Sequence, residues 1–134
     1  MAAAHAVLQH LKAEGSSLQT ELNQRTTHFV QTLNQYFEAD EVPIRMANFG
    51  SLFGPVVGDA DDVAEPNDTA ISFVLLYYHL IERGVLPRGN GGFLSTAHTD
   101  ADLEFILQAI QDSVQALRSA QFLPSLTCSL VTQS

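Results

Sequence analysis

The chain has 134 residues, of which 46% are hydrophobic and 16% charged, so it suits one packed domain and is too apolar for wholesale disorder. Six Lys and Arg residues against fifteen Asp and Glu residues leave a net charge of −9, which argues against binding to nucleic acid or to an anionic membrane. The apolar run over residues 70–81 is too short to span a bilayer. The single cysteine, Cys128, permits no intramolecular disulfide, and we expect a cytoplasmic protein.

The first 37 residues predict a long, interrupted helix. Residues 2–13 form its first part, and Gly15 interrupts it. Ser16 and Gln19 have the spacing of a capping box, so a second helix is expected from there to about Phe37. Its apolar residues recur at helical intervals, at Leu18, Leu22, Phe29, Leu33 and Phe37.

Two strands are expected next, over residues 45–49 and 52–57, with a bend at Gly50. Pro55 favours an edge position or a bulge for the second strand, because proline lacks the N–H that a ladder needs. The acidic residues 58–68 do not have the spacing of a calcium loop, and we expect a solvated loop there.

A third helix is predicted over residues 69–83, followed by short strands at 85–86 and 93–94 around a glycine-rich bend. Thr99 and Asp102 have capping-box spacing and begin a clear amphipathic helix that ends near residue 119. This order of elements predicts an α+β fold, with a short antiparallel sheet packed against helices.

Side chains with catalytic potential are few. No GxGxxG, Walker A, HExxH, CxxC or GxSxG motif is present, and we expect no metal site. The only lysine, Lys12, lies on an amphipathic helix, where a solvated side chain is expected rather than a Schiff base. His98 precedes a helix N-cap, where a hydrogen bond that shapes the loop is favoured over a general base.

The segment Arg88-Gly89-Asn90-Gly91-Gly92 is the best candidate for a binding loop. An arginine pairs well with a carboxylate, and glycines let a ligand approach the backbone. The alternative is a flexible hairpin connection that carries a surface arginine.

Several segments, taken in order, resemble the C-terminal part of glutamate-1-semialdehyde aminomutase and related class III aminotransferases. They are Asn48 to Gly54, His79 to Val85 and, most closely, Gly92 to Thr99 with its Phe-Leu-Ser-Thr-Ala-His-Thr string. The resemblance covers about residues 1–118. One departure is that Asn90 replaces the glutamate of the aminomutase loop, a form more similar to the aminotransferase domains of polyketide and nonribosomal peptide synthases.

The resemblance implies the small C-terminal domain of a fold type I enzyme that uses pyridoxal phosphate and is homodimeric as a whole. Connecting helices would span residues 1–38, the small domain 39–118, and a tail or interdomain linker 119–134. The catalytic lysine and most cofactor contacts would lie in a large N-terminal domain that precedes Met1. In this chain, Arg88 and Asn90 would form part of the substrate-site wall.

Two functions from different classes follow. In the first, the chain is the inactive C-terminal fragment of a transaminase, which moves an amino group to or from an amino acid, a keto acid or a carrier-bound acyl substrate. In the second, it is a free-standing α+β interaction module without catalysis. The first predicts that the isolated chain exposes apolar surface, including parts of the first two helices.

Overall fold

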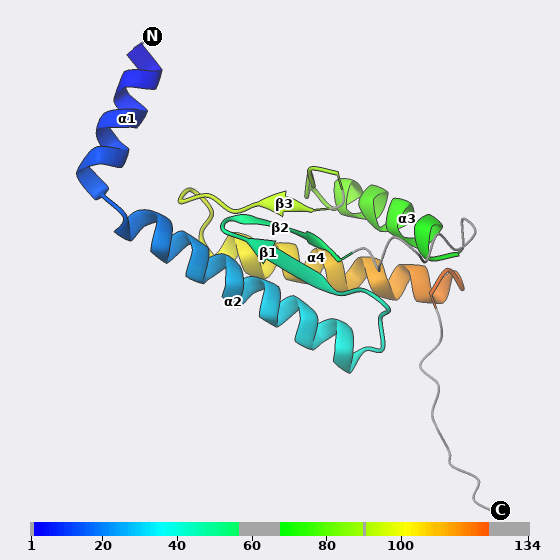
Figure 1. The fold of residues 1–134 in the computed structure, drawn as a ribbon. Helices are drawn as coiled ribbons and strands as arrows, with labels where there is room; N and C mark the ends of the chain where they lie inside the picture. The colour runs from blue at the N-terminus through cyan, green and yellow to red at the C-terminus, as the bar shows by residue number, and fades with distance from the viewer. Residues whose placement is uncertain (1, 57–67, 90, 124–134) are drawn as a thin grey trace, which may run out of the picture.

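The computed structural model describes residues 2–56, 68–89 and 91–123, and for residues 68–73 the backbone only. The fold is α+β, with a three-stranded antiparallel sheet in the order β1-β2-β3 and helices packed against it, as predicted (Figure 1). The elements are α1 (Ala2–Glu14), α2 (Ser17–Ala39), β1 (Met46–Phe49), β2 (Leu52–Pro55), α3 (Asp68–Glu82), β3 (Gly92–Phe93) and α4 (Asp100–Ser119).

The predicted interruption of the first helix is confirmed. Gly15 has a φ of +66° and separates α1 from α2, a backbone conformation that favours glycine. The predicted capping box at Ser16 is wrong, because the Ser16 backbone is itself helical and its side chain makes no cap hydrogen bond. Helix α1 contains no buried residue and projects away from the body of the domain (Figure 1).

The sheet packs against α2 through one of its two faces. The Phe53 ring meets the Phe29 ring edge to face, with the centroids 5.6 Å apart. The Asn34 amide exchanges two hydrogen bonds with the Met46 backbone, of 2.8 and 2.9 Å. Since β1 lies at the edge of the sheet, these bonds satisfy backbone groups that would otherwise remain unpaired.

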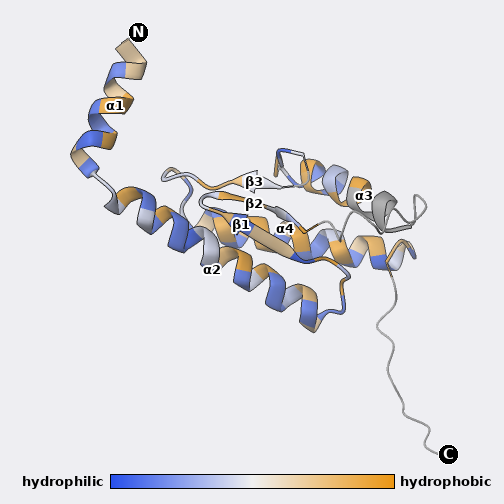
Figure 2. Cartoon of the chain, in the orientation of Figure 1, coloured by the Kyte–Doolittle hydropathy of each residue, from blue (hydrophilic) through white to orange (hydrophobic). Residues whose placement is uncertain are grey.

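The core lies between α2, α4, the sheet and the end of α3. Figure 2 shows apolar and polar residues alternating along α2 and α4, as expected of helices with one buried face. Leu33 and Val114 are fully buried at the centre. The other buried apolar residues around them are Phe29, Phe37, Val42, Leu80, Leu94, Ala109, Ile110, Leu117 and Leu123.

An ion pair joins the C-terminal ends of α2 and α4. The Arg118 guanidinium lies 3.0 Å from an Asp40 carboxylate oxygen and also donates to the Asp40 carbonyl. The Tyr36 hydroxyl donates to the same carboxylate at 3.1 Å. Burial, together with this bond to Asp40, raises the pKa of Tyr36 well above its usual range. The shift favours the protonated phenol, which is the form that donates this hydrogen bond.

Two predictions about the strands are wrong. Pro55 was expected at an edge position or a bulge, whereas β2 is the central strand and Pro55 pairs with Met46 in regular register. Proline is tolerated there because Pro55 is the last residue of β2, beyond the two positions that pair with β3. Residues 85–86 form no strand, because the chain runs there from the end of α3 toward the next turn without a ladder partner.

Other parts of the predicted organisation are outside what the structure tests. The acidic segment lies mostly outside the described residues, as do Cys128 and most of the tail. The division at residues 38 and 118 stays a prediction. No helix in the described part of the chain is long and apolar enough to cross a membrane.

The predicted capping box of α4 is confirmed. The Thr99 side chain accepts a hydrogen bond from the Asp102 N–H at 3.2 Å, and the Asp102 carboxylate accepts one from the Thr99 N–H at 2.7 Å. We predict that Thr99→Ala lowers the free energy of unfolding by roughly 0.5–2 kcal/mol, because it removes the N-cap acceptor. Urea denaturation measures this, and Thr99→Ser should retain most of the wild-type stability.

The same box makes stability depend on pH. The Thr99 backbone and side-chain hydrogen bonds, in that order, lower the pKa of Asp102. A carboxyl group whose pKa is lower in the folded state stabilises the fold at pH values above its unfolded pKa of about 4. This contribution disappears as the pH falls through the folded-state pKa. We predict that wild type exceeds Asp102→Asn in melting temperature at pH 7 and that the gap narrows below about pH 4. A gap that is the same at every pH contradicts this assignment.

Candidate substrate-binding site

The candidate binding loop is a tight hairpin between α3 and β3. The Arg88 N–H donates to the Gly91 carbonyl at 2.9 Å, and the Gly91 N–H donates to the Arg88 carbonyl at 3.3 Å. Gly89 has a φ of +61°, which the turn requires and glycine supplies without strain. We call residues 88–91 the Arg88 hairpin.

Gly91 holds the Arg88 hairpin close to the central strand. A Cβ atom at this position would lie 2.1 Å from the Phe53 carbonyl oxygen and 2.8 Å from the Gly54 Cα atom. Neither backbone atom can move aside cheaply, so only glycine fits there. The hairpin is therefore anchored on the sheet at Gly91. The alternative of a merely flexible connection does not describe this end of the hairpin.

The Arg88 side chain lies exposed over an aromatic ring. Its Cζ atom is 5.4 Å from the centroid of the Phe93 ring. A guanidinium that stacks on a ring keeps the N–H groups at its edge available for a planar, bidentate carboxylate. Within the described part of the chain, no acidic side chain forms an ion pair with Arg88. The geometry thus suits a carboxylate ligand.

The structure describes only one of the two predicted site residues, Arg88. Asn90 lies outside the described residues, so its place in the substrate-site wall stays a prediction. Phe93, which supports the Arg88 guanidinium, was not identified from the sequence as a site residue. Phe93 lies five positions after Arg88, beyond the hairpin. The sequence indicated only that it belongs to the following strand, which does not predict a contact with Arg88.

His98 lies in a second polar cluster, where it shapes the loop before α4. The His98 Nδ1 atom accepts a hydrogen bond from the Ser95 N–H at 3.0 Å and lies 2.9 Å from the Ser95 Oγ atom. Arg25 of α2 donates to the His98 carbonyl and pairs with Asp100 at 2.6 Å. These contacts fit the expected loop-shaping role of His98. The sequence analysis did not identify Arg25 as a member of this cluster. Arg25 and Asp100 are 75 residues apart, and no local sequence pattern predicts a contact over that separation.

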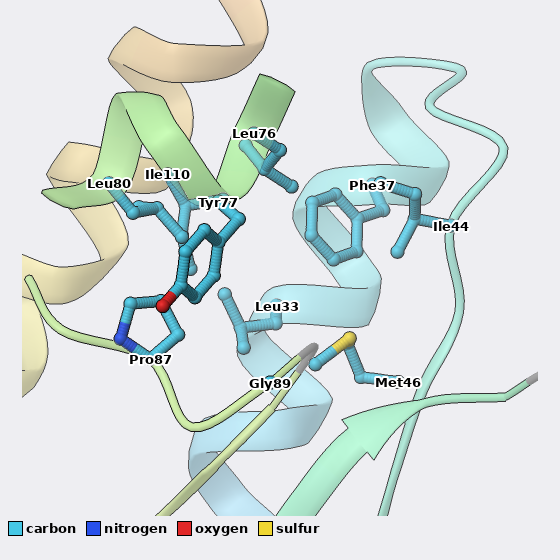
Figure 3. A pocket seen from close by; sticks show the side chains of 10 residues that line it. All are labelled: Leu33, Phe37, Ile44, Met46, Leu76, Tyr77, Leu80, Pro87, Gly89 and Ile110. Atoms are coloured by element: carbon cyan, nitrogen blue, oxygen red, sulfur yellow. The ribbon is translucent and has the colours of Figure 1, made fainter. Parts of the chain in front are cut away.

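An apolar pocket opens between α2, α3 and the Arg88 hairpin (Figure 3). Its volume of about 60 Å³ is far below the roughly 300–1,000 Å³ typical of small-molecule sites. The pocket is therefore too small to be the substrate site. Its lining residues are Leu33, Phe37, Ile44, Met46, Leu76, Tyr77, Leu80, Pro87, Gly89 and Ile110.

Lys12 is the only lysine in the sequence. Lys12 is exposed on α1, a helix without a buried residue, so it lacks the enclosed setting that a Schiff-base lysine requires. This chain's residues therefore do not fit covalent attachment of an aldehyde cofactor. No group of three His, Cys, Asp or Glu side chains in the described ranges is arranged to hold a metal ion.

Known proteins with similar sequences include aminomutases. The chain is 30% identical over 125 residues to glutamate-1-semialdehyde 2,1-aminomutase of Syntrophus aciditrophicus, a match that covers 87% of this chain and 28% of the relative. It is 28% identical over 102 residues to the enzyme of the same name from Chloroflexus aggregans, covering 69% of this chain and 23% of the relative. No protein-family model matches the chain.

The fold is similar to that of a solved aminotransferase. A β-phenylalanine aminotransferase from Variovorax paradoxus superposes with a TM-score of 0.64 at 24% identity, over 78% of this chain and 25% of that protein. The resemblance to the C-terminal part of a class III, fold type I aminotransferase is confirmed. The chain spans about a quarter of the length of the curated relatives it matches.

The close packing of the Arg88 hairpin can be tested by substitution. We predict that Gly91→Ala lowers the melting temperature clearly more than Gly89→Ala. Gly91→Ala forces a steric overlap with the β2 backbone, whereas an added Cβ at Gly89 meets no atom within 4 Å and brings only the cost of a positive φ. Thermal unfolding followed by circular dichroism measures both variants. Equal losses would contradict the close approach of residue 91 to β2.

Proposed function

We propose that this chain is the C-terminal small domain of a pyridoxal-phosphate-dependent transaminase. The longer parent would transfer an amino group to or from an amino acid, a keto acid or a carrier-bound acyl substrate. Support comes from the aminomutase relatives, which match over most of this chain, and from the fold shared with a solved aminotransferase. The large domain of the parent would supply the lysine and most contacts to the cofactor.

The contribution proposed for this segment is recognition of a carboxylate. The observation that carries it is the exposed Arg88 guanidinium, whose Cζ atom lies over the Phe93 ring, 5.4 Å from its centroid. An arginine can pair with a carboxylate through two hydrogen bonds at once. Amino acids and keto acids both carry such a carboxylate. Where the acceptor is a carrier-bound thioester, the carboxylate would be that of the amino donor. Asn90, two positions after Arg88 in the sequence, is proposed for the same wall.

A homodimeric parent and the branch embedded in polyketide or nonribosomal peptide synthases are further parts of the proposal. The Arg-Gly-Asn-Gly-Gly form of the loop supports the synthase branch. The experiment that tests the transaminase function is to purify the longer polypeptide that contains this segment. Retention of pyridoxal phosphate through gel filtration, with amino-group transfer between an amino acid and a keto acid, is expected. A polypeptide without either property would leave the interaction-module alternative.

We predict that Arg88→Ala in that longer enzyme lowers kcat/KM for the carboxylate-bearing substrate by about 10–100-fold, because a charge-assisted pair contributes roughly 1.5–3 kcal/mol. The loss should appear mainly in KM. Steady-state kinetics with donor and acceptor varied separately identifies which of them Arg88 binds.

Two further variants serve as comparisons for Arg88→Ala. Arg88→Lys keeps the charge and loses the planar fork, so an intermediate loss is expected. Arg83→Ala removes an arginine that bonds to His79 and Glu82 within the end of α3 and should leave the kinetics unchanged. Unchanged constants for both substrates in Arg88→Ala would remove Arg88 from the proposed site.

A further inference from the structure

A second cavity lies where the residues that follow α3 meet the beginning of α4. Its volume is about 390 Å³, which falls within the roughly 300–1,000 Å³ typical of small-molecule sites. It shares no lining residue with the smaller apolar pocket beside the Arg88 hairpin. We call this cavity the α3–α4 groove. The residues that line it include Val85, Leu86, His98, Asp102, Phe105 and Ile106.

The walls of the α3–α4 groove carry two large apolar side chains that remain in contact with water. Leu86, in the segment after α3, is 81% exposed, and Phe105 of α4 is 53% exposed. Gly84 also lines the groove and keeps it open, because a Cβ atom there would lie 4.0 Å from the Phe105 Cζ atom. A flat apolar group placed in the groove would remove both side chains from water.

His98 supplies a hydrogen-bond donor to the groove. Its Nδ1 atom accepts a hydrogen bond from the Ser95 N–H at 3.0 Å. A backbone N–H can only donate, so the neutral imidazole carries its proton on the Nε2 atom. The Nε2 atom has no hydrogen-bond partner among the described residues. The Nε2–H group is therefore available to a ligand.

Asp102 supplies an acceptor to the same groove. Its Oδ2 atom accepts hydrogen bonds from the Thr99 N–H at 2.7 Å and from the Thr99 hydroxyl at 2.8 Å. The Oδ1 atom makes no hydrogen bond with any residue that the structure describes. The capping box thus uses one oxygen of the carboxylate and leaves the other for a ligand.

We propose that the α3–α4 groove binds a small molecule with a planar apolar body and a neutral primary carboxamide. The carboxamide oxygen would accept from the His98 Nε2–H group, and its NH₂ group would donate to the Asp102 Oδ1 atom. The planar body would lie between Leu86 and Phe105, where an aromatic ring gains both apolar contact and ring packing. This inference is independent of the proposed transaminase function.

The chemistry of the groove disfavours ionised ligands. A carboxylate has no proton to donate to Asp102 and would bring a second negative charge beside it. An ammonium group has no acceptor for the His98 Nε2–H group. A carboxamide offers an acceptor and a donor side by side, so it satisfies both residues. The groove therefore selects a different ligand class from Arg88, which suits a carboxylate.

Benzamide is the probe that tests the proposal. It is titrated into the 15N-labelled 134-residue chain and followed by backbone amide NMR. We expect saturable shifts centred on residues 84–86, 97–98 and 102–106, with a Kd of about 1 mM, as is ordinary for so small a ligand. Benzoate has nearly the same shape and should bind at least about tenfold more weakly, because it leaves Asp102 facing a like charge. Acetophenone keeps the acceptor and lacks the donor, so an intermediate affinity is expected.

Substitutions locate the bound probe. Ala97 is exposed and lines the groove, so Ala97→Leu should leave the fold intact and abolish binding by filling the space. Ala47→Leu makes the same change at an exposed position on β1 and is the matched control, with unchanged binding expected. Asp102→Asn removes the negative charge and keeps an acceptor oxygen, so it should narrow the gap in affinity between benzamide and benzoate.

Each outcome decides the proposal. Saturable binding that Ala97→Leu abolishes, with benzamide preferred over benzoate, supports it. No saturable shift at about ten times the expected Kd of roughly 1 mM overturns it. Equal affinities for the three probes, or binding that survives Ala97→Leu, also overturn it, because the ligand would then be held by apolar contact alone or at another place. None of these results alters the case for Arg88.

Discussion

The packing of the apolar face of α2 is the interaction on which the rest of the domain depends. Leu33 is fully buried at its centre, Phe29 contacts the sheet through Phe53, and Asn34 satisfies the edge of β1. Arg25 reaches the loop before α4 from the same helix. The sheet, the loop and α4 are all positioned against α2. The Arg88 hairpin packs on the sheet, so its position also depends on α2, a helix that begins some seventy residues earlier.

Exposed apolar surface is distributed unevenly over the described part of the chain. Parts of the first two helices were expected to expose apolar surface. On α2, residues such as Phe29 and Leu33 are covered within the chain. The expectation is confirmed for α1, where Val7 and Leu8 are more than half exposed.

The site combines a rigid backbone with an exposed charge. Gly91 packs closely against the β2 backbone, and the Arg88 guanidinium lies over the Phe93 ring. An arginine held in this way loses less side-chain freedom on binding a carboxylate than one on a free loop.

The sequence by itself determined the helices, the first two strands, the capping box at Thr99 and the α+β class, because these depend on local periodicity and turn chemistry. The resemblance pointed to Arg88 from loop position. Only the tertiary structure decided that β2 is central despite Pro55, that residues 85–86 belong to no strand, and that Arg25 meets Asp100. Strand order and contacts across 75 residues depend on how elements pack, and no local pattern encodes that packing. Phe49, Leu52 and Phe93 form one row for the same reason: only the register of three strands brings them together.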